Sequence, residues 1–367
     1  MNDFFEELNN FIFSSEINCD DDYKNRIVST IDEYISIVSK HFNDYTDDLL
    51  LIKEYLVNSF DYMMAGKVRK AHNEIEELYK QYESKLLIHN MKFGSSINIY
   101  KDVNKFLYKG RRGGWNESYS RKDIFHIPFD RRDLIKTQRF SIPGIPSIYL
   151  SHSIMGVWEE LNRPSFDELF ISRFVLDDET KILDLGLNVL DFKPFVSSLS
   201  DPNNKQYGII KKVFDRFILT NLLKIVSSIN VNDENRVFKS EYVLPQILLL
   251  VGVEDSCFEG VRYPSVKVQS DSYLFVNYAL PALPDKSSDN YSNILKKKMK
   301  LTLPVNIGLY SSMSDEVMYM NLDENLYRRN TVINVNKNIQ RVYKDSNFFK
   351  LEMKLYSEKE LKVDRIP

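Results

Sequence analysis

Cysteine and glycine are both scarce in this chain. Among 367 residues there are 2 cysteines, Cys19 and Cys257, which lie far apart and at no spacing typical of metal ligands. We therefore expect free thiols in a reducing cytoplasm rather than a disulfide framework or a zinc site. The 12 glycines form neither a Gly-x-Gly-x-x-Gly fingerprint nor a P-loop, so the sequence gives no support for a Rossmann dehydrogenase or an NTPase.

An excess of charge of either sign is also absent. The 49 basic and 52 acidic residues leave a formal net charge of -3, which argues against a nucleic-acid or anionic-membrane partner. The longest apolar run, 243–253, is too short and interrupted to span a bilayer. The acidic start, Met1 to Phe4, lacks the basic region of a signal peptide. We therefore expect a cytoplasmic protein without a membrane segment.

Hydrophobic periodicity divides the chain into three regions. Residues 1–95 follow a helical period and predict a bundle-like domain. Residues 96–281 mix short strands with helices, and residues 282–367 form an extension to which we assign no role. The expected fold class is α+β. The segments expected as helices are 27–38, 52–63, 68–82, 208–226 and 242–251, and those expected as strands are 171–176, 181–185, 273–280, 301–310 and 316–320.

The segment from Arg139 to Glu160 brings together three kinds of side chain. Arg139 precedes a turn, 143–146, whose two prolines and one glycine restrict its conformation. A short strand carrying Tyr149 is expected next, and then a helix over 152–161 carrying Glu160. A cation, an aromatic face and a carboxylate suit a charged ligand that contains a ring, such as a nucleotide.

This segment resembles the RES-domain family, which is named for an arginine, a glutamate and a serine. The family pattern is matched by Arg139-Phe140-Ser141, Gly144-x-Pro146 and Tyr149, with Phe140 where the family often has tryptophan. The family's glutamate follows the tyrosine by eleven residues, which selects Glu160, with Glu159 as the alternative if the helix starts one residue differently. The serine motif is matched by Gly260 to Ser265, and the resemblance covers about Lys101 to Pro281.

Family members also carry an arginine directly after a tyrosine in the first strand of the domain. Here Lys109 follows Tyr108, so we assign the arginine's role to Arg111, which shares a face with Lys109 in an extended segment. Tyr108 and Tyr263 are further candidates for stacking on a ligand ring. His126 is a candidate base, although a lone histidine among apolar residues is more often structural.

The resemblance implies an ADP-ribosyltransferase-like mixed core, with NAD as substrate and with no cofactor or metal. The implied reaction cleaves the bond between nicotinamide and ribose, which builds positive charge on the ribose. Glu160 would stabilise that charge or hold the ribose hydroxyls. Arg111 and Arg139 would bind the pyrophosphate, Tyr149 would contact the nicotinamide ring or the ribose, and Ser265 would hydrogen-bond the carboxamide.

The implied function is an NAD glycohydrolase or phosphorylase that depletes NAD as a bacterial toxin, in a toxin–antitoxin pair or in phage defence. Two alternatives stay open: an ADP-ribosyltransferase acting on a macromolecule, and a non-catalytic nucleotide-binding or interaction protein, which the lysine at position 109 favours. The helical region 1–95 is a candidate surface for an antitoxin, a regulator or a second copy, but a structural cap is the favoured interpretation. The lysines at 296–298 and Lys300 are candidates for phosphate contacts, with a solvated face as the favoured alternative.

Overall fold

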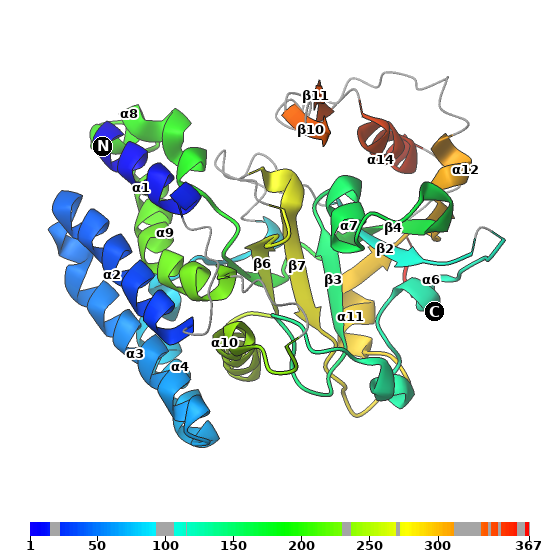
Figure 1. The fold of residues 1–367 in the computed structure, drawn as a ribbon, viewed down its shortest axis with the longest axis horizontal. Coiled ribbons are helices and arrows are strands. Elements are labelled where there is room, and N and C mark those ends of the chain that lie inside the picture. Colours follow the sequence, from blue (N-terminus) through cyan, green and yellow to red (C-terminus); the bar gives the residue numbers. More distant parts are fainter. Residues whose placement is uncertain are drawn as a thin grey trace. The chain divides into compact units, whose positions relative to one another are not determined.

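The computed structural model describes residues 1–14, 23–92, 106–114, 116–229, 236–268, 272–311, 332–336, 339–343, 346–357 and 364–366. It is a mixed arrangement of helices and strands, consistent with the predicted α+β class (Figure 1). The chain divides into two compact units, each built from separate stretches of sequence. Unit 1 comprises 1–89, 136–143 and 181–266, and unit 2 comprises 90–135, 144–180 and 267–367. The three consecutive regions expected from the sequence stay a prediction about domains.

Unit 1 consists mostly of helices whose apolar faces share one core. The helices are α1 (Asn2–Ser14), α2 (Tyr23–His41), α3 (Thr46–Met64), α4 (Val68–Tyr82), α8 (Val196–Ser200), α9 (Tyr207–Ser228) and α10 (Val243–Glu254). Buried tyrosines join the early helices to the later ones, because Tyr34 on α2 donates to the Ile218 carbonyl and Tyr79 on α4 donates to the Leu248 carbonyl. Each hydroxyl is thereby satisfied inside the core. The expected helices at 27–38, 52–63, 68–82, 208–226 and 242–251 are confirmed.

A small group of strands completes unit 1. Strand β5 (Lys181–Asp184) lies between β1 (Ile88–Asn90) and β6 (Gly260–Pro264), and its pairing with β6 is parallel. Asp184 is fully buried between the Arg262 guanidinium, at 2.7 Å, and the His89 ring, at 3.2 Å. Burial alone would raise the pKa of Asp184, but Arg262 and His89 outweigh it and hold that pKa well below its usual range.

Unit 2 is built on an antiparallel sheet with the strand order β7-β3-β2-β4-β8, and β9 also pairs with β4. The strands are β2 (Phe106–Arg112), β3 (Ser147–Ser151), β4 (Leu169–Leu176), β7 (Val276–Pro281), β8 (Met299–Leu301) and β9 (Val305–Asn306). The helices are α6 (Arg121–Ile124), α7 (Ile154–Glu160), α11 (Asn293–Lys298), α12 (Ile307–Ser311) and α14 (Asn347–Ser357). Strands β10 (Val332–Asn336) and β11 (Ile339–Val342) form a separate antiparallel pair.

Two expected strands of unit 2 were wrong in part. Residues 273–275 form a 3-10 turn before β7, because the Ser272 hydroxyl accepts from the Leu274 amide and starts a helical turn. Residues 307–311 form α12 rather than extended chain, because the Asn306 side chain accepts from the Gly308 amide. The strands expected at 171–176 and 181–185 are confirmed, and residues 316–320 lie outside the described residues.

Helix α7 packs closely on the sheet of unit 2 because two glycines leave room for it (Figure 1). A Cβ on Gly110 would lie 2.4 Å from Val157 and 2.9 Å from Leu161, both at the inner side of α7. A Cβ on Gly156 of α7 would lie 2.2 Å from the Ser151 hydroxyl. The α7 core that results comprises Tyr108, Ile154, Val157, Leu169, Ile171, Ile307, Leu351 and Leu355.

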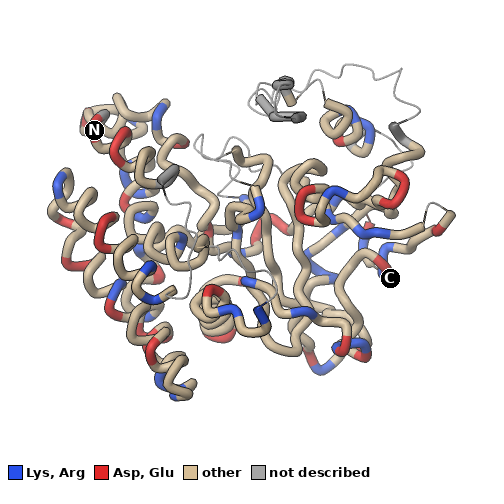
Figure 2. The backbone as a smooth tube through the Cα atoms, in the orientation of Figure 1, with Lys and Arg blue, Asp and Glu red and all other residues tan. Residues whose placement is uncertain are grey.

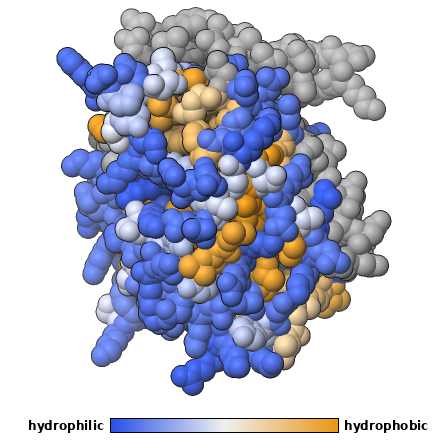
Figure 3. Space-filling model, turned by 90° about the vertical axis from the view of Figure 1, so that its left-hand side faces the viewer, coloured by the Kyte–Doolittle hydropathy of each residue, from blue (hydrophilic) through white to orange (hydrophobic). Residues whose placement is uncertain are grey.

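Charged side chains of both signs are distributed over the whole chain, as its nearly neutral composition suggests. Figure 2 shows Lys and Arg interspersed with Asp and Glu along the chain rather than separated by sign. The face drawn in Figure 3 is mainly hydrophilic, with apolar patches between hydrophilic side chains. Leu50, Met64 and Val68 are among the large apolar side chains of unit 1 that are exposed. Within the described stretches, every helix is too short or too polar to cross a membrane.

The close packing of α7 gives a direct test of the fold. We expect Gly110→Ala to lower the unfolding free energy by about 1–3 kcal/mol, because the added methyl overlaps Val157 and Leu161. Urea denaturation followed by the fluorescence of Trp158, which packs against the α7 core, measures the loss. Gly114→Ala is the control, since its Cβ would meet Glu117 at an ordinary 3.6 Å. Equal midpoints for the two variants would contradict the account.

Candidate functional site

Glu160 lies at the last position of α7 and is held by a strand residue. Its Oε1 atom accepts a 2.7 Å hydrogen bond from Nδ2 of Asn277, which is buried on β7. Asn277 is directly opposite Ser151 on β3, and Ser151 is directly opposite Tyr108 on β2. Opposed residues of antiparallel strands point to the same face of a sheet. Tyr108, Ser151 and Asn277 therefore form a row on the face that α7 covers.

Tyr149 shares this face with Glu160. It precedes Ser151 by two residues, so its side chain points the same way, and it stands opposite Ala279, next to Asn277 on the neighbouring strand. Diagonal neighbours of this kind are within reach of an aromatic side chain. Tyr149 is half-buried. Tyr149 thus lies on the same face of the sheet as Asn277, the partner of Glu160.

Two buried polar atoms in this row have no hydrogen-bond partner among the described residues. They are Oδ1 of Asn277 and the hydroxyl of Ser151. Buried polar atoms are rarely left in this state, and such atoms concentrate where ligands or water bind. We define the candidate site as Tyr149, Ser151, Glu160 and Asn277. Tyr149 and Glu160 are the partly exposed members of this set, whereas Ser151 and Asn277 are buried.

The C-terminal end of α7 is fixed by two cations. Lys267 donates to the Glu160 carbonyl and to Oδ1 of Asn162, both at 2.8 Å, and Arg112 donates to the Leu161 carbonyl. Positive charge here complements the negative end of the helix dipole. Asn162 and Arg163 have φ angles of 59° and 52°, and the Arg163 amide donates to the Trp158 carbonyl, which ends the helix in a Schellman-type turn.

Glu159 and Glu160 have different partners. Glu159 forms a 2.8 Å ion pair with Nε of Arg163, one turn further along the chain. Glu160 instead reaches Asn277 on the sheet. Successive helix positions point about 100° apart, which explains why the two carboxylates diverge. Of the pair, only Glu160 contacts the sheet residue Asn277, and its predicted role toward a ligand stays a prediction.

Lys109 and Arg111 lie on the opposite face of the sheet from Tyr108. Side chains alternate along a strand, and both cations reach the end of α6 instead of α7. Lys109 donates to the Phe125 carbonyl, and Arg111 donates to the Asp123 carbonyl at 2.8 Å. Burial, reinforced by the charge of Arg111, lowers the pKa of Lys109 to about 8. The structure does not bring these two residues together with Glu160, and their contact with a pyrophosphate stays a prediction.

Arg139, Tyr263 and Ser265 belong to unit 1. Arg139 is buried, and its Nη1 atom lies 3.0 Å from the Ser227 carbonyl and 3.4 Å from the Glu241 carbonyl. Burial lowers the pKa of this guanidinium. The Tyr263 ring packs on Phe140 at a centroid distance of 4.6 Å, and Ser265 is buried directly after β6. Their predicted roles toward NAD are not tested by these contacts.

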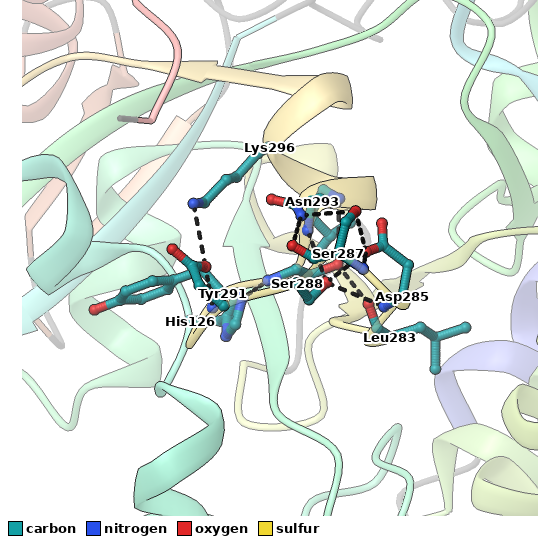
Figure 4. A network of polar contacts seen from close by, with 11 residues as sticks. His126, Leu283, Asp285, Ser287, Ser288, Tyr291, Asn293 and Lys296 are labelled. Atoms are coloured by element: carbon teal, nitrogen blue, oxygen red, sulfur yellow. Dashed lines mark hydrogen bonds and ion pairs between the residues drawn. The ribbon is translucent and has the colours of Figure 1, made fainter.

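His126 is buried in unit 2 with both ring nitrogens engaged (Figure 4). Its Nε2 atom accepts from the Ser292 amide at 2.9 Å, and Nδ1 donates to the Ile127 carbonyl at 2.8 Å. These contacts require the neutral ring with its proton on Nδ1. Burial, opposed in part by the Ile127 carbonyl, lowers the pKa of His126 to about 4. The ring thus fixes the start of α11, and a role as a base stays a prediction.

The sequence interpretation missed four residues around the α7 face. Asn277 could have been noticed as the polar residue within an apolar strand, 276–281. Arg173 extends the row across the sheet, because it is buried opposite Tyr108 with its guanidinium 4.8 Å from the Phe106 ring centroid. No sequence motif marks Lys267 and Arg112, because their partners are backbone carbonyls at the end of α7. Within the described part of the chain, no three His, Cys, Asp or Glu side chains are grouped as a metal ion would require.

Comparison with known proteins gives a partial match. A protein of Bacillus subtilis (strain 168) named "Putative toxin YopC" is 35% identical over 210 residues, which cover 54% of this chain and 46% of that protein. The chain thus spans about half the length of this curated relative. No protein-family model matches the chain. No solved structure matches it either. The RES-domain resemblance and the ADP-ribosyltransferase-like core therefore stay predictions.

The contacts of His126 predict a pH dependence of stability. In the folded state the pKa of His126 is about 4, whereas the pKa of a histidine in the unfolded chain is near 6.5. Between these values the unfolded chain binds more protons, so the contribution is complete above about pH 6.5 and is lost as the pH falls. Between pH 7 and pH 5 we expect a loss of about 2 kcal/mol.

His126→Gln isolates this contribution, because glutamine cannot be protonated in that range. Denaturant unfolding at pH 7 and pH 5 should show a smaller loss in the variant than in the parent. The same loss in both proteins would show that His126 is not the group responsible.

Proposed function

We propose that this protein is a toxin-type enzyme that cleaves the bond between nicotinamide and ribose in NAD. The observation that carries the proposal is the Glu160 carboxylate, fixed by Asn277 on the sheet face that also presents Tyr149. The RES-domain resemblance supplies the chemistry expected of this glutamate and tyrosine. The name of the B. subtilis relative supports the toxin role.

The reaction places specific demands on the candidate site. When the glycosidic bond breaks, its electron pair leaves with the nicotinamide nitrogen, which becomes neutral, and positive charge develops on the ribose. A water molecule then adds through its oxygen to the ribose carbon and releases a proton. A carboxylate that is already oriented stabilises the developing charge with little reorganisation. Asn277 provides this orientation for Glu160, and Tyr149 offers a face to the nicotinamide ring.

Release of nicotinamide tests the proposal with a matched pair of variants. We expect the purified protein to convert NAD to nicotinamide and ADP-ribose. Glu160→Gln should lower kcat by at least about a hundredfold, because it removes charge stabilisation in the transition state. Glu159→Gln should keep most activity, since Glu159 contacts Arg163. Chromatography of the products over time measures kcat for both variants.

Three outcomes would overturn this proposal in different ways. Intact NAD under all conditions, including added divalent metal and candidate partner proteins, would exclude cleavage. ADP-ribose found only on a macromolecule would identify a transferase on the same scaffold. A larger loss of kcat in Glu159→Gln than in Glu160→Gln would show that Glu159, and not Glu160, acts on NAD.

Asn277→Asp tests the hydrogen bond itself. The substitution nearly preserves shape but places two carboxyl groups at hydrogen-bond distance, and such a pair shares one proton. We expect the acid side of the pH–rate profile to move to higher pH by about one unit or more, with KM less affected than kcat. Asn306→Asp, at a buried amide that caps α12, is a control for general damage. An unshifted profile in Asn277→Asp would contradict the positioning role.

A further inference from the structure

A cavity of about 170 Å³ in unit 2 shares no lining residue with the candidate site. It is lined by Ser287, Asn293, Lys296, Lys297, Arg365 and Ile366. Three of these six residues are cations and none is a carboxylate. Cavities that hold a drug-sized ligand are generally about 300–1,000 Å³, so this one matches a smaller group.

The cations are not equally committed to protein partners. Lys296 pairs with Asp289 at 3.4 Å and lies over the Tyr291 ring (Figure 4). No hydrogen bond or ion pair joins the Lys297 ammonium or the Arg365 guanidinium to another of the described residues. Two uncommitted positive charges at one cavity complement a doubly charged anion.

The wall of the cavity is preorganised by its own hydrogen bonds (Figure 4). The Asp285 carboxylate accepts from the Ser287 amide and from the hydroxyls of Ser287 and Ser288. The hydrogen bonds from Ser287 hold the pKa of Asp285 below its usual range. Asn293 donates at 2.7 Å to the Ser287 carbonyl, and His126 holds the Ser292 amide. A wall held in this way loses little entropy when a ligand binds.

We infer that this cavity binds a phosphate group through Lys297 and Arg365, while Ser287 and Asn293 form its neutral wall. The phosphate belongs either to free inorganic phosphate or to the 5′-phosphate of a nucleotide. The Arg365 guanidinium suits two phosphate oxygens at once, and the Lys297 ammonium adds a point charge. The site is independent of the proposed NAD cleavage, because it shares no residue with the candidate site.

Calorimetric titration of the full chain with inorganic phosphate tests the inference. We expect saturable binding that weakens with added salt, since both cations are exposed. The double variant Lys297→Ala/Arg365→Ala should weaken it by at least about tenfold, because it removes two charged contacts. Lys205→Ala, at an exposed lysine of unit 1 that does not line the cavity, should bind like the parent. Arg365→Lys in place of Arg365→Ala should recover part of the lost affinity. Lysine restores the positive charge but not the planar guanidinium that binds two oxygens at once.

AMP and adenosine distinguish the two sources of phosphate. Tighter binding of AMP than of phosphate, lost in the double variant, assigns a nucleotide phosphate, whereas equal affinities assign free phosphate. Adenosine should not bind at this site. No saturable phosphate binding, or equal losses in Lys205→Ala and the double variant, overturns the inference. Glu160→Gln should bind phosphate normally, so failure of the proposed NAD cleavage would leave this result unchanged.

Discussion

The close contact between α7 and the sheet of unit 2 is the constraint on which the candidate site depends. Gly110 removes the side chain that would separate Val157 and Leu161 from β2, and Gly156 brings the helix against Ser151. With the helix this close, a residue at its last turn reaches the strand beneath it, and Glu160 meets Asn277 at 2.7 Å. A displacement of α7 by the width of one methyl group would break this hydrogen bond.

Several cations near α7 have structural roles and do not belong to the candidate site. Arg112 and Lys267 stabilise the carboxyl end of the helix, so their charges are used in holding Glu160 in place. Lys109 and Arg111 stabilise the end of α6 on the other face of the sheet. Arg173 is a buried arginine on the same face as the candidate site, in the row that runs from Asn277 through Ser151 and Tyr108.

The parts of the structure that depend on local pattern were predicted from the sequence. The helices of unit 1 follow their apolar spacing, and the turn at 143–146 precedes a strand and a helix as expected. Two short segments were wrong because a single side-chain cap, from Ser272 or Asn306, decided between strand and helical turn. The partners of Glu160, Lys109 and Arg139 could not be predicted, because each lies on a distant segment and contacts depend on strand register and packing.

We propose that NAD binds at the carboxyl end of α7, with its ribose at Glu160. A crystal structure of the Glu160→Gln protein with NAD tests it most directly, since the variant should bind the substrate without consuming it. The account predicts the nicotinamide ring against Tyr149 and the ribose hydroxyls beside residue 160, within reach of Asn277. NAD bound instead at Lys109 and Arg111, on the opposite face of the sheet, would contradict it.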